Sequence, residues 1–122
     1  MEDLEKQQKA NFELIGRLLR TSFNGAQISA CKIPTDGRKF KILHDGRKMF
    51  LCVSLEYLSD QREERIQRHF KDLNVQNVLL RSLDQPLLLS NESVHKGGLE
   101  LISAANAKCS SKYEEAPILW PQ

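Results

Sequence analysis

The chain has 122 residues, of which 40% are hydrophobic and 28% charged, and its formal net charge is +2. This size and composition predict one soluble globular domain over residues 1–122, rather than two, and a chain of this length can bury enough surface to fold without stabilising cross-links. A net charge this close to zero does not by itself indicate binding to nucleic acid.

The three cysteines, Cys31, Cys52 and Cys109, are odd in number, lie far apart and show no zinc-ligand spacing. We expect them to be reduced thiols, which are typical of a reducing compartment. The first residues are acidic and do not resemble a signal peptide, and no segment approaches the 18 apolar residues of a membrane span. These features predict a cytoplasmic protein without a metal or other cofactor.

The first ten residues are mostly polar, and we expect this extension to project into solvent or to fray. From Asn11 onward, apolar side chains recur at helical spacing and predict an amphipathic helix. Asn24-Gly25 supplies the residues that commonly end a helix. The apolar stripe consists of Phe12, Leu14, Ile15, Leu18 and Leu19.

Three short segments with alternating side-chain character follow, at 27–33, 38–44 and 48–55. Asp36-Gly37 and Asp45-Gly46 stand between them, and Asp-Gly favours tight hairpin turns because both residues tolerate positive φ. The third segment is apolar on both faces, so we expect it in the interior of a sheet. The second is expected to expose one lysine-bearing face to solvent.

The second half of the chain is predicted to begin with a helix capped by Ser59 or Asp60. Strands are expected at 75–80 and 87–89, a loop at 91–98, a last helix at 99–109 and a tail over 111–122. The predicted order is α-β-β-β-α-β-β-α, an α+β fold in which helices pack on an antiparallel three-stranded meander.

The sequence holds no phosphate-binding loop, dinucleotide-binding motif, zinc-protease motif or serine-hydrolase motif. His44, His69 and His95 each stand alone, and only His44, beside Asp45 at a turn, is placed where it could transfer a proton. No cysteine neighbours a histidine. We therefore expect that the chain is not an enzyme.

The order α-β-β-β-α-β over residues 10–82 resembles the core of restriction-endonuclease-like nucleases. That family holds a divalent metal with an aspartate that follows a proline and with an acidic-x-lysine triplet on the next strand. Pro34-Thr35-Asp36 is similar to the first part, but residues 51–54, Leu-Cys-Val-Ser, offer neither carboxylate nor lysine for the second. The resemblance implies a catalytically degenerate member of that family.

The complete order α-β-β-β-α-β-β-α also resembles class I type III secretion chaperones, which are homodimers that bind an extended segment of an effector protein. Those chaperones are typically acidic, whereas this chain is slightly basic. The resemblance implies self-association and a protein partner, by analogy of topology.

Positive charge is concentrated between residues 32 and 48, where six basic and two acidic side chains give a local charge of +4. Lysines and arginines on adjacent strands can form a patch on the scale of phosphate spacing. The alternative is a solvated strand face that discourages edge pairing. The residues of this possible nucleic-acid site are Lys32, Arg38, Lys39, Lys41, Arg47 and Lys48.

Two apolar segments exceed what a minimal core requires, and we predict that they form a protein interface with Trp120 as its anchor. Our first interpretation is a small, non-catalytic accessory protein that acts through protein–protein contacts and self-associates as a homodimer. Nucleic-acid binding through the basic segment is the alternative, and a degenerate nuclease-like domain is the second alternative. The predicted interface residues are Leu87, Leu88, Leu89, Ile118, Leu119 and Trp120.

Overall fold

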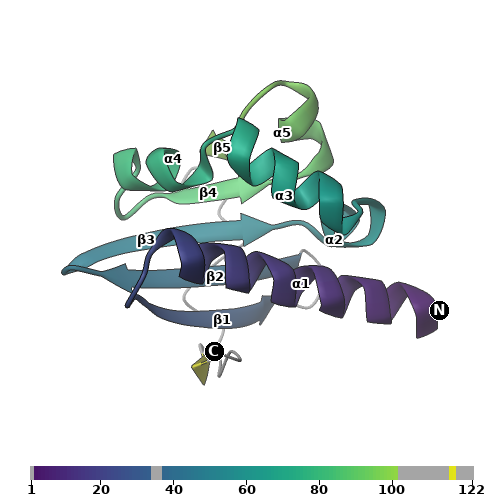
Figure 1. Ribbon diagram of the computed structural model, residues 1–122, viewed down its shortest axis with the longest axis horizontal. Coiled ribbons are helices and arrows are strands. Elements are labelled where there is room, and N and C mark those ends of the chain that lie inside the picture. Colours follow the sequence, from purple (N-terminus) through teal and green to yellow (C-terminus); the bar gives the residue numbers. More distant parts are fainter. Residues whose placement is uncertain (1, 34–36, 102–115, 118–122) are drawn as a thin grey trace.

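The computed structural model describes residues 2–33, 37–101 and 116–117, and within them the side chains of residues 6–30 and 38–101. Five helices and one six-stranded sheet make up this part of the chain (Figure 1). The helices are α1 (Glu2–Ser22), α2 (Leu55–Asp60), α3 (Glu63–Asp72), α4 (Val75–Arg81) and α5 (Asn91–His95). The strands are β1 (Gln27–Ile33), β2 (Gly37–His44), β3 (Arg47–Val53), β4 (Pro86–Leu89), β5 (Glu100–Leu101) and β6 (Ala116–Pro117). The predicted α+β class is confirmed.

The predicted antiparallel meander is formed by β1, β2 and β3. The hairpin between β2 and β3 turns at Asp45 and Gly46, whose φ values are 52° and 74°, as the Asp-Gly pair predicts. The strand order is β5-β4-β3-β2-β1-β6, so β3 lies in the interior as expected. Strand β2 also has a neighbour on each side, and its lysines therefore do not protect a sheet edge.

The sheet continues beyond the meander through a parallel pairing of β4 with β3. Because parallel strands need a crossover connection, the chain between them runs through α2, α3 and α4 before it returns as β4. Strand β5 then pairs antiparallel with β4 and ends the sheet on that side. The result is a mixed sheet rather than an isolated meander.

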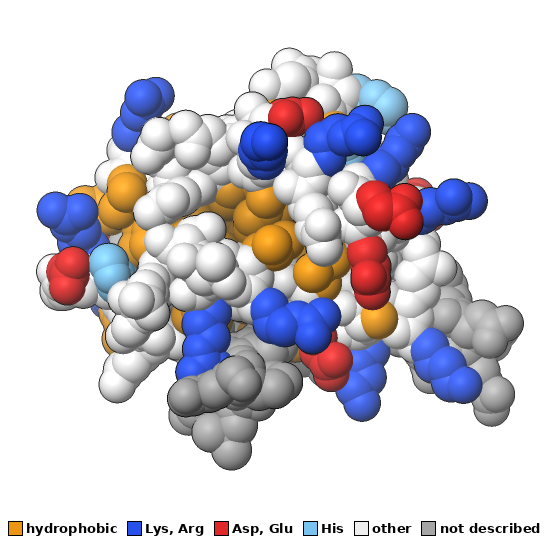
Figure 2. All heavy atoms as spheres, in the orientation of Figure 1, with side chains coloured by type: hydrophobic (Ala, Val, Ile, Leu, Met, Phe, Trp, Pro, Cys, Tyr) orange, Lys and Arg blue, Asp and Glu red, His pale blue; other side chains and the backbone are white. Residues whose placement is uncertain are grey.

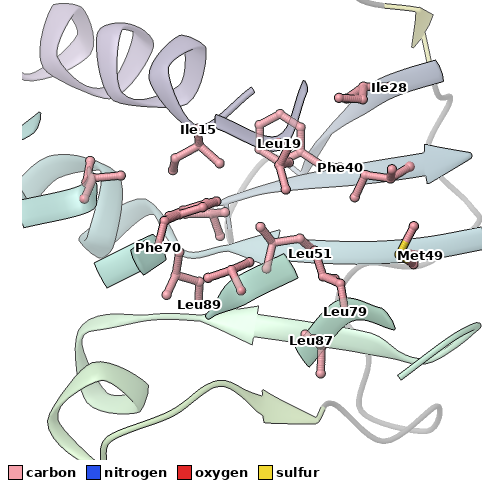
Figure 3. Close-up of a cluster of buried hydrophobic side chains, with 14 of the residues drawn as sticks. Ile15, Leu19, Ile28, Phe40, Met49, Leu51, Phe70, Leu79, Leu87 and Leu89 are labelled. Atoms are coloured by element: carbon pink, nitrogen blue, oxygen red, sulfur yellow. The ribbon is translucent and has the colours of Figure 1, made fainter. Parts of the chain in front are cut away.

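The core lies on one face of the sheet, which we call the near face, and α1 crosses this face (Figure 1). Pairings Phe40↔Leu51 and Ile42↔Met49 place one set of side chains toward the helices. The ring of Phe12 stacks on Phe40 with their centroids 4.8 Å apart. Figure 3 shows the strand residues meeting those of the helices: Ile15 and Leu19 of α1, Phe70 of α3, and Leu79 of α4.

Helix α1 begins nine residues earlier than the apolar stripe predicts, because its polar opening turns bind the end of α2. Gln7 Nε2 donates to the Ser59 carbonyl at 2.8 Å, and Gln8 Nε2 donates to Ser59 Oγ at 2.6 Å. The expectation that residues 1–10 fray is therefore wrong for Gln7 and Gln8. The start of α1 could not be predicted from hydrophobic periodicity, because hydrogen bonds from glutamines produce no such pattern.

Residues 75–80, predicted as a strand, form helix α4 instead. Val75 and Leu79 are buried four residues apart on one helical face, and Asn74 turns the chain with a φ of 52°. The β-branched residues raised the expectation of a strand, but burial against the near face decides the conformation here. Residues 91–98, predicted as a loop, include α5, where Ser90 Oγ accepts from Ser93 N at 3.1 Å.

The helix predicted to begin at Ser59 or Asp60 also differs from the structure. Helix α2 begins earlier, because Ser54 Oγ accepts from Tyr57 N at 3.1 Å, and it ends at Asp60. Helix α3 starts after Arg62 without a side-chain cap. The predicted helix over 99–109 is contradicted at its start, where Glu100–Leu101 is β5, and its remaining residues lie outside the described part.

Cys52 on β3 is 2% exposed and is disulfide-bonded. The expectation that all three cysteines are reduced thiols is therefore wrong. None of the helices that the structure describes combines the length and apolar character needed to cross a membrane.

Candidate functional site

The six basic residues predicted to bind nucleic acid do not lie together. We call the sheet face opposite α1 to α4 the far face, and the strand register places Lys39, Lys41 and Lys48 on it. Arg38 and Arg47 alternate to the near face. The side chain of Lys32 lies outside those that the structure describes.

Lys39 differs from the other basic residues because it is only 4% exposed. Its ammonium nitrogen lies 5.4 Å from the ring centroid of Phe50 on the neighbouring strand, a cation–π contact. Burial of Arg38 lowers the pKa of its guanidinium. A buried lysine and a half-buried arginine offer little surface to a phosphate, so the accessible part of the predicted site consists of Lys41, Arg47 and Lys48.

Two of the predicted interface residues are core residues. Leu87 and Leu89 are 1% and 0% exposed, because the parallel pairing sets them beside Leu51 and Val53 of β3 on the near face. Leu88 alternates to the far face and is half-buried. Ile118, Leu119 and Trp120 lie outside the described residues. Of the predicted apolar interface, the described part of the chain leaves Leu88 accessible.

A different apolar side chain is the most exposed large hydrophobic residue among those described. Leu101 is 59% exposed and belongs to β5, which pairs with β4 on one side and ends the sheet. Leu83, in the turn before β4, and Leu43, near the β2–β3 hairpin, are each 38% exposed. The sequence interpretation missed Leu101 because it assigned residues 99–109 to a helix, and a two-residue strand has no periodicity to detect.

The near face presents charges of both signs around visible apolar side chains (Figure 2). Partly buried Leu18 of α1 and Leu73, which follows α3, pack against the core. Helix α3 carries Glu63 and Glu64 in its first turn and the basic residues Arg65 and Arg68 after them. Because the signs are mixed, this face does not present the single-sign field that a polyanion requires.

His44, the predicted proton-transfer candidate, has a structural environment. Its Nε2 lies 3.2 Å from the Asn24 carbonyl oxygen, and its Nδ1 lies 3.7 Å from Asp45 Oδ2. The edge of its ring meets Phe23 at 5.7 Å between centroids. These contacts join the β2–β3 hairpin to the end of α1, so a structural role explains the position of His44.

A second histidine forms a pair that the sequence did not indicate. The Tyr57 hydroxyl lies 2.9 Å from Nδ1 of His69, and Tyr57 is fully buried. Burial raises the pKa of Tyr57 above its usual range. Burial also lowers the pKa of His69, Arg65 and Arg68 lower it further, and Asp72 opposes them. Near neutral pH the hydrogen bond therefore joins a neutral phenol to a neutral imidazole, and it links α2 to α3.

A cluster of amide side chains ties α1 to the α2–α3 junction and to α5. Asn11 Nδ2 donates to the carbonyls of Leu58 and Gln61 at 2.7 and 2.8 Å. Gln61 Nε2 in turn donates to Asn91 Oδ1, and Asn91 Nδ2 donates to Asp60 Oδ2 at 2.8 Å. The two bonds from Asn11 satisfy carbonyls at the end of α2, and the other two join side chains of the α2–α3 junction to α5, so the cluster holds these helices together.

The nuclease resemblance can be tested only in part. Residues 51–53 occupy the interior of the sheet, and Cys52 is disulfide-bonded, so β3 supplies no metal ligand there. Asp36 lies outside the described residues. Within the described part of the chain, no three His, Cys, Asp or Glu side chains lie close enough together to hold a metal ion.

Comparisons of the chain with protein-family models, with curated proteins and with solved structures find no match.

Proposed function

We propose that the chain is a non-catalytic binding protein that acts through protein–protein contacts and associates with a second copy of itself along the β5 edge. The observation that carries this proposal is Leu101, which is 59% exposed on the strand that ends the sheet. An edge strand has backbone groups directed outward that can pair with another strand. An exposed leucine beside them adds apolar surface that association would bury.

A two-fold axis suits this edge. Strand β5 is antiparallel to β4, and a second copy related by the axis could add its own β5 antiparallel to the first. Such an interface is self-complementary and closes as a dimer instead of growing into a fibre. This is the homodimer expected from the sequence, but with its contact at Leu101 instead of Leu87 and Leu89.

The test is the molar mass of the protein by size-exclusion chromatography with light scattering over a range of concentrations. We expect a dimer for the unchanged chain and a monomer for Leu101→Lys, because each copy would place a charge in the contact. Leu43→Lys is the matched control, since Leu43 is 38% exposed but lies on an interior strand. A monomer at all concentrations, or a dimer that Leu101→Lys leaves intact, would contradict the proposal.

Nucleic-acid binding is the second candidate, and the position of β2 favours it. Because β2 lies between β1 and β3, the need to protect an edge does not explain Lys41. Lys41 and Lys48 share the far face of β2 and β3, and Arg47 lies next to Lys48 at the turn but on the near face. We expect fluorescence anisotropy with DNA and RNA oligonucleotides to show binding that weakens steeply with salt.

A charge-matched control can separate this site from general attraction to a basic chain. The variant Lys41→Gln/Arg47→Gln/Lys48→Gln should lose binding, whereas Arg65→Gln/Arg68→Gln/Lys71→Gln on α3 removes the same charge and should retain it. Equal losses in both variants would indicate non-specific attraction only.

The nuclease resemblance over residues 10–82 loses its last strand, because residues 75–80 are helix α4 and the next strand is β4 at Pro86–Leu89. A metal-dependent nuclease activity would overturn the non-catalytic proposal.

The cytoplasmic location predicted from the sequence rests partly on the expectation of reduced cysteines. The disulfide at Cys52 removes that part of the argument, because structural disulfides are rare in a reducing cytosol. Alkylation of free thiols in intact cells before lysis tests the location. A cytoplasmic chain is expected to be fully alkylated, and a Cys52 thiol protected from the reagent would argue for an oxidising compartment.

A further inference from the structure

We propose that the turn between α1 and β1 is a site of spontaneous backbone modification, at which Asn24 is converted into aspartate and isoaspartate, and that His44 promotes this conversion. This inference goes beyond the proposed function and does not depend on it. It gives a chemical role to two features of the sequence, the Asn24-Gly25 pair and the histidine beside Asp45. The turn lies at the same end of the sheet as the β2–β3 hairpin, which carries His44 (Figure 1).

Asn24 is followed by glycine, and this order favours attack on the asparagine side chain. The attacking atom is the main-chain nitrogen of the next residue, and a side chain on that residue hinders its approach to Cγ. Gly25 has no Cβ and leaves the approach open. The other asparagines of the described part are followed by larger residues: Asn11 by Phe12, Asn74 by Val75, Asn77 by Val78, and Asn91 by Glu92.

The reacting groups of this pair are accessible. Asn24 and Gly25 are both exposed, so solvent water reaches them. The turn is closed by Ala26 N, which donates to Phe23 O at 3.0 Å, and Gly25 has a φ of 86°. None of the hydrogen bonds within the described residues uses the Gly25 N–H. The nitrogen can therefore react without the loss of a native hydrogen bond.

His44 is placed to favour loss of the proton from the Gly25 nitrogen. Its Nε2 lies 3.2 Å from the Asn24 carbonyl oxygen, and since a carbonyl only accepts, Nε2–H is the donor. That oxygen shares the resonance of the peptide bond to Gly25, so deprotonation of the nitrogen places negative charge on it. A donor aimed at an oxygen where charge develops stabilises the charged state. The edge of the His44 ring contacts Phe23 at 5.7 Å between centroids, which holds the ring in this position.

The reaction balances with water as the co-reactant. The Gly25 nitrogen gives its proton to solvent and forms a bond to Cγ of Asn24, and the side-chain nitrogen takes a proton from solvent and leaves as ammonia. The product is a cyclic imide between the two residues. Water then opens this ring: attack at Cγ breaks the new bond and gives aspartate, whereas attack at the main-chain carbonyl carbon breaks the original peptide bond and gives isoaspartate. Neither step involves oxidation or reduction.

The products change the junction of α1 with the β2–β3 hairpin. Both add a carboxylate, which lowers the formal net charge of +2 by one unit. In isoaspartate the main chain runs through Cγ and gains a methylene group, and the former Asn24 carbonyl becomes a carboxylate that faces His44. A hydrogen bond to a charged acceptor is stronger than one to a neutral carbonyl. The modified turn therefore keeps its contact with the hairpin, and we expect the product to accumulate in the folded protein.

The first experiment follows the conversion in the folded, full-length protein during incubation at neutral pH. Trypsin releases Asn24 in peptide 21–32 and Asn74 and Asn77 in peptide 72–81, and mass spectrometry measures the mass gain of deamidation in each. A zero-time sample corrects for conversion during digestion, and electron-transfer fragmentation separates aspartate from isoaspartate. We expect peptide 21–32 to convert severalfold faster than 72–81 and to contain isoaspartate. Equal rates in the two peptides would overturn the proposal.

The second experiment measures the contribution of His44. The variant His44→Phe keeps a ring beside Phe23 but removes the donor, and His44→Gln supplies an amide donor in its place. We expect His44→Phe to slow the conversion of Asn24 severalfold and His44→Gln to restore part of the rate, with His95→Phe as the unaffected control. In urea, where the hairpin no longer holds residue 44 beside residue 24, all the proteins should convert at the same rate. An unchanged rate in His44→Phe that circular dichroism shows to be folded would overturn the role of His44, as would a slower rate that persists in urea.

Discussion

At the scale of single residues, the Tyr57–His69 contact shows how the fold selects protonation states. The phenol is fully buried and the imidazole is partly buried, and both are held in their neutral forms. Their 12-residue separation crosses the α2–α3 junction, so no motif reveals the pair. His69 therefore contributes to stability through its neutral form, and protonation should weaken the contact.

We predict that the free energy of unfolding decreases as the pH falls from about 7 to 5. Burial and Arg65 hold the pKa of folded His69 below that of the unfolded chain, about 6.5, so the unfolded state binds the proton first and gains stability. The contribution is fully present above about pH 6.5 and is lost below it. The effect is small because the imidazole is partly solvated.

Urea denaturation at several pH values measures this dependence. His69→Asn removes the titrating group, keeps an acceptor for the phenol and should reduce the slope. His95→Asn, on an exposed part of α5, is the control and should retain it. The same slope in all three proteins would refute the assignment to His69.

Asn11 carries a second prediction at this scale. Its amide nitrogen serves two buried carbonyls, so Asn11→Ala leaves Leu58 O and Gln61 O without this donor. Gln61 O keeps a second, longer donor, Gln7 Nε2 at 3.3 Å, so the main loss is at Leu58 O. A buried group without its donor costs about 1–3 kcal/mol, and we expect Asn11→Ala to lower the free energy of unfolding by about 2 kcal/mol. Asn77→Ala on the exposed side of α4 should change it by less than about 0.5 kcal/mol. Equal effects in denaturant titrations would show that the amide cluster contributes nothing specific.

At the scale of elements, local chemistry explains what the sequence could predict. The meander is specified by alternation and by Asp45-Gly46, because both signals act within a few residues. Helix α4 was mistaken for a strand because Val75 and Val78 favour strands locally, while burial of Val75 and Leu79 against the near face favours a helix. Ser54 sets the start of α2 through a local cap, whereas the end of α2 is held by hydrogen bonds from Asn11 of α1, which is distant in the sequence.

The β2–β3 hairpin provides a prediction at this scale. Gly46 has a φ of +74°, a conformation that costs other L-residues about 1–2 kcal/mol, although a Cβ there would meet no atom within 4 Å. Gly46→Ala should therefore lower the free energy of unfolding by about 1 kcal/mol. Gly98→Ala, in equally open space and without a positive φ, is the matched control and should cost less. If thermal denaturation finds equal losses, strain at the turn is not the cause.

At the scale of the whole molecule, the sheet order determines which sequence-derived site residues are accessible. The Leu87–Leu89 run resembles surplus apolar surface until the parallel pairing with β3 places Leu87 and Leu89 in the core. The sequence pattern predicts a solvent-facing Lys39, but β2 lies between two strands and the Lys39 side chain is buried. Leu101 is prominent only because β5 ends the sheet. A single sequence does not contain these neighbours, so the predicted class is confirmed while most site residues are redistributed.

The disulfide provides a prediction for the molecule as a whole. Cys52 is buried in the central strands, and a cross-link there limits the conformations of the unfolded chain. Dithiothreitol reduces the bond by thiol–disulfide exchange, its two thiols forming a cyclic disulfide as the protein thiols are released. We expect reduction to lower the free energy of unfolding by about 2–4 kcal/mol, as is typical for a native disulfide.

Denaturation with and without dithiothreitol measures this difference. Cys31→Ser should show the same loss on reduction as the unchanged chain, because the register separates Cys31 from Cys52. Cys52→Ser should be less stable from the start and insensitive to the reductant, and the same holds for Cys109→Ser if its sulfur is the partner. If reduction leaves the unchanged chain equally stable, the cross-link does not constrain the unfolded state. If Cys31→Ser is the variant that loses its sensitivity, the strand register itself must be different.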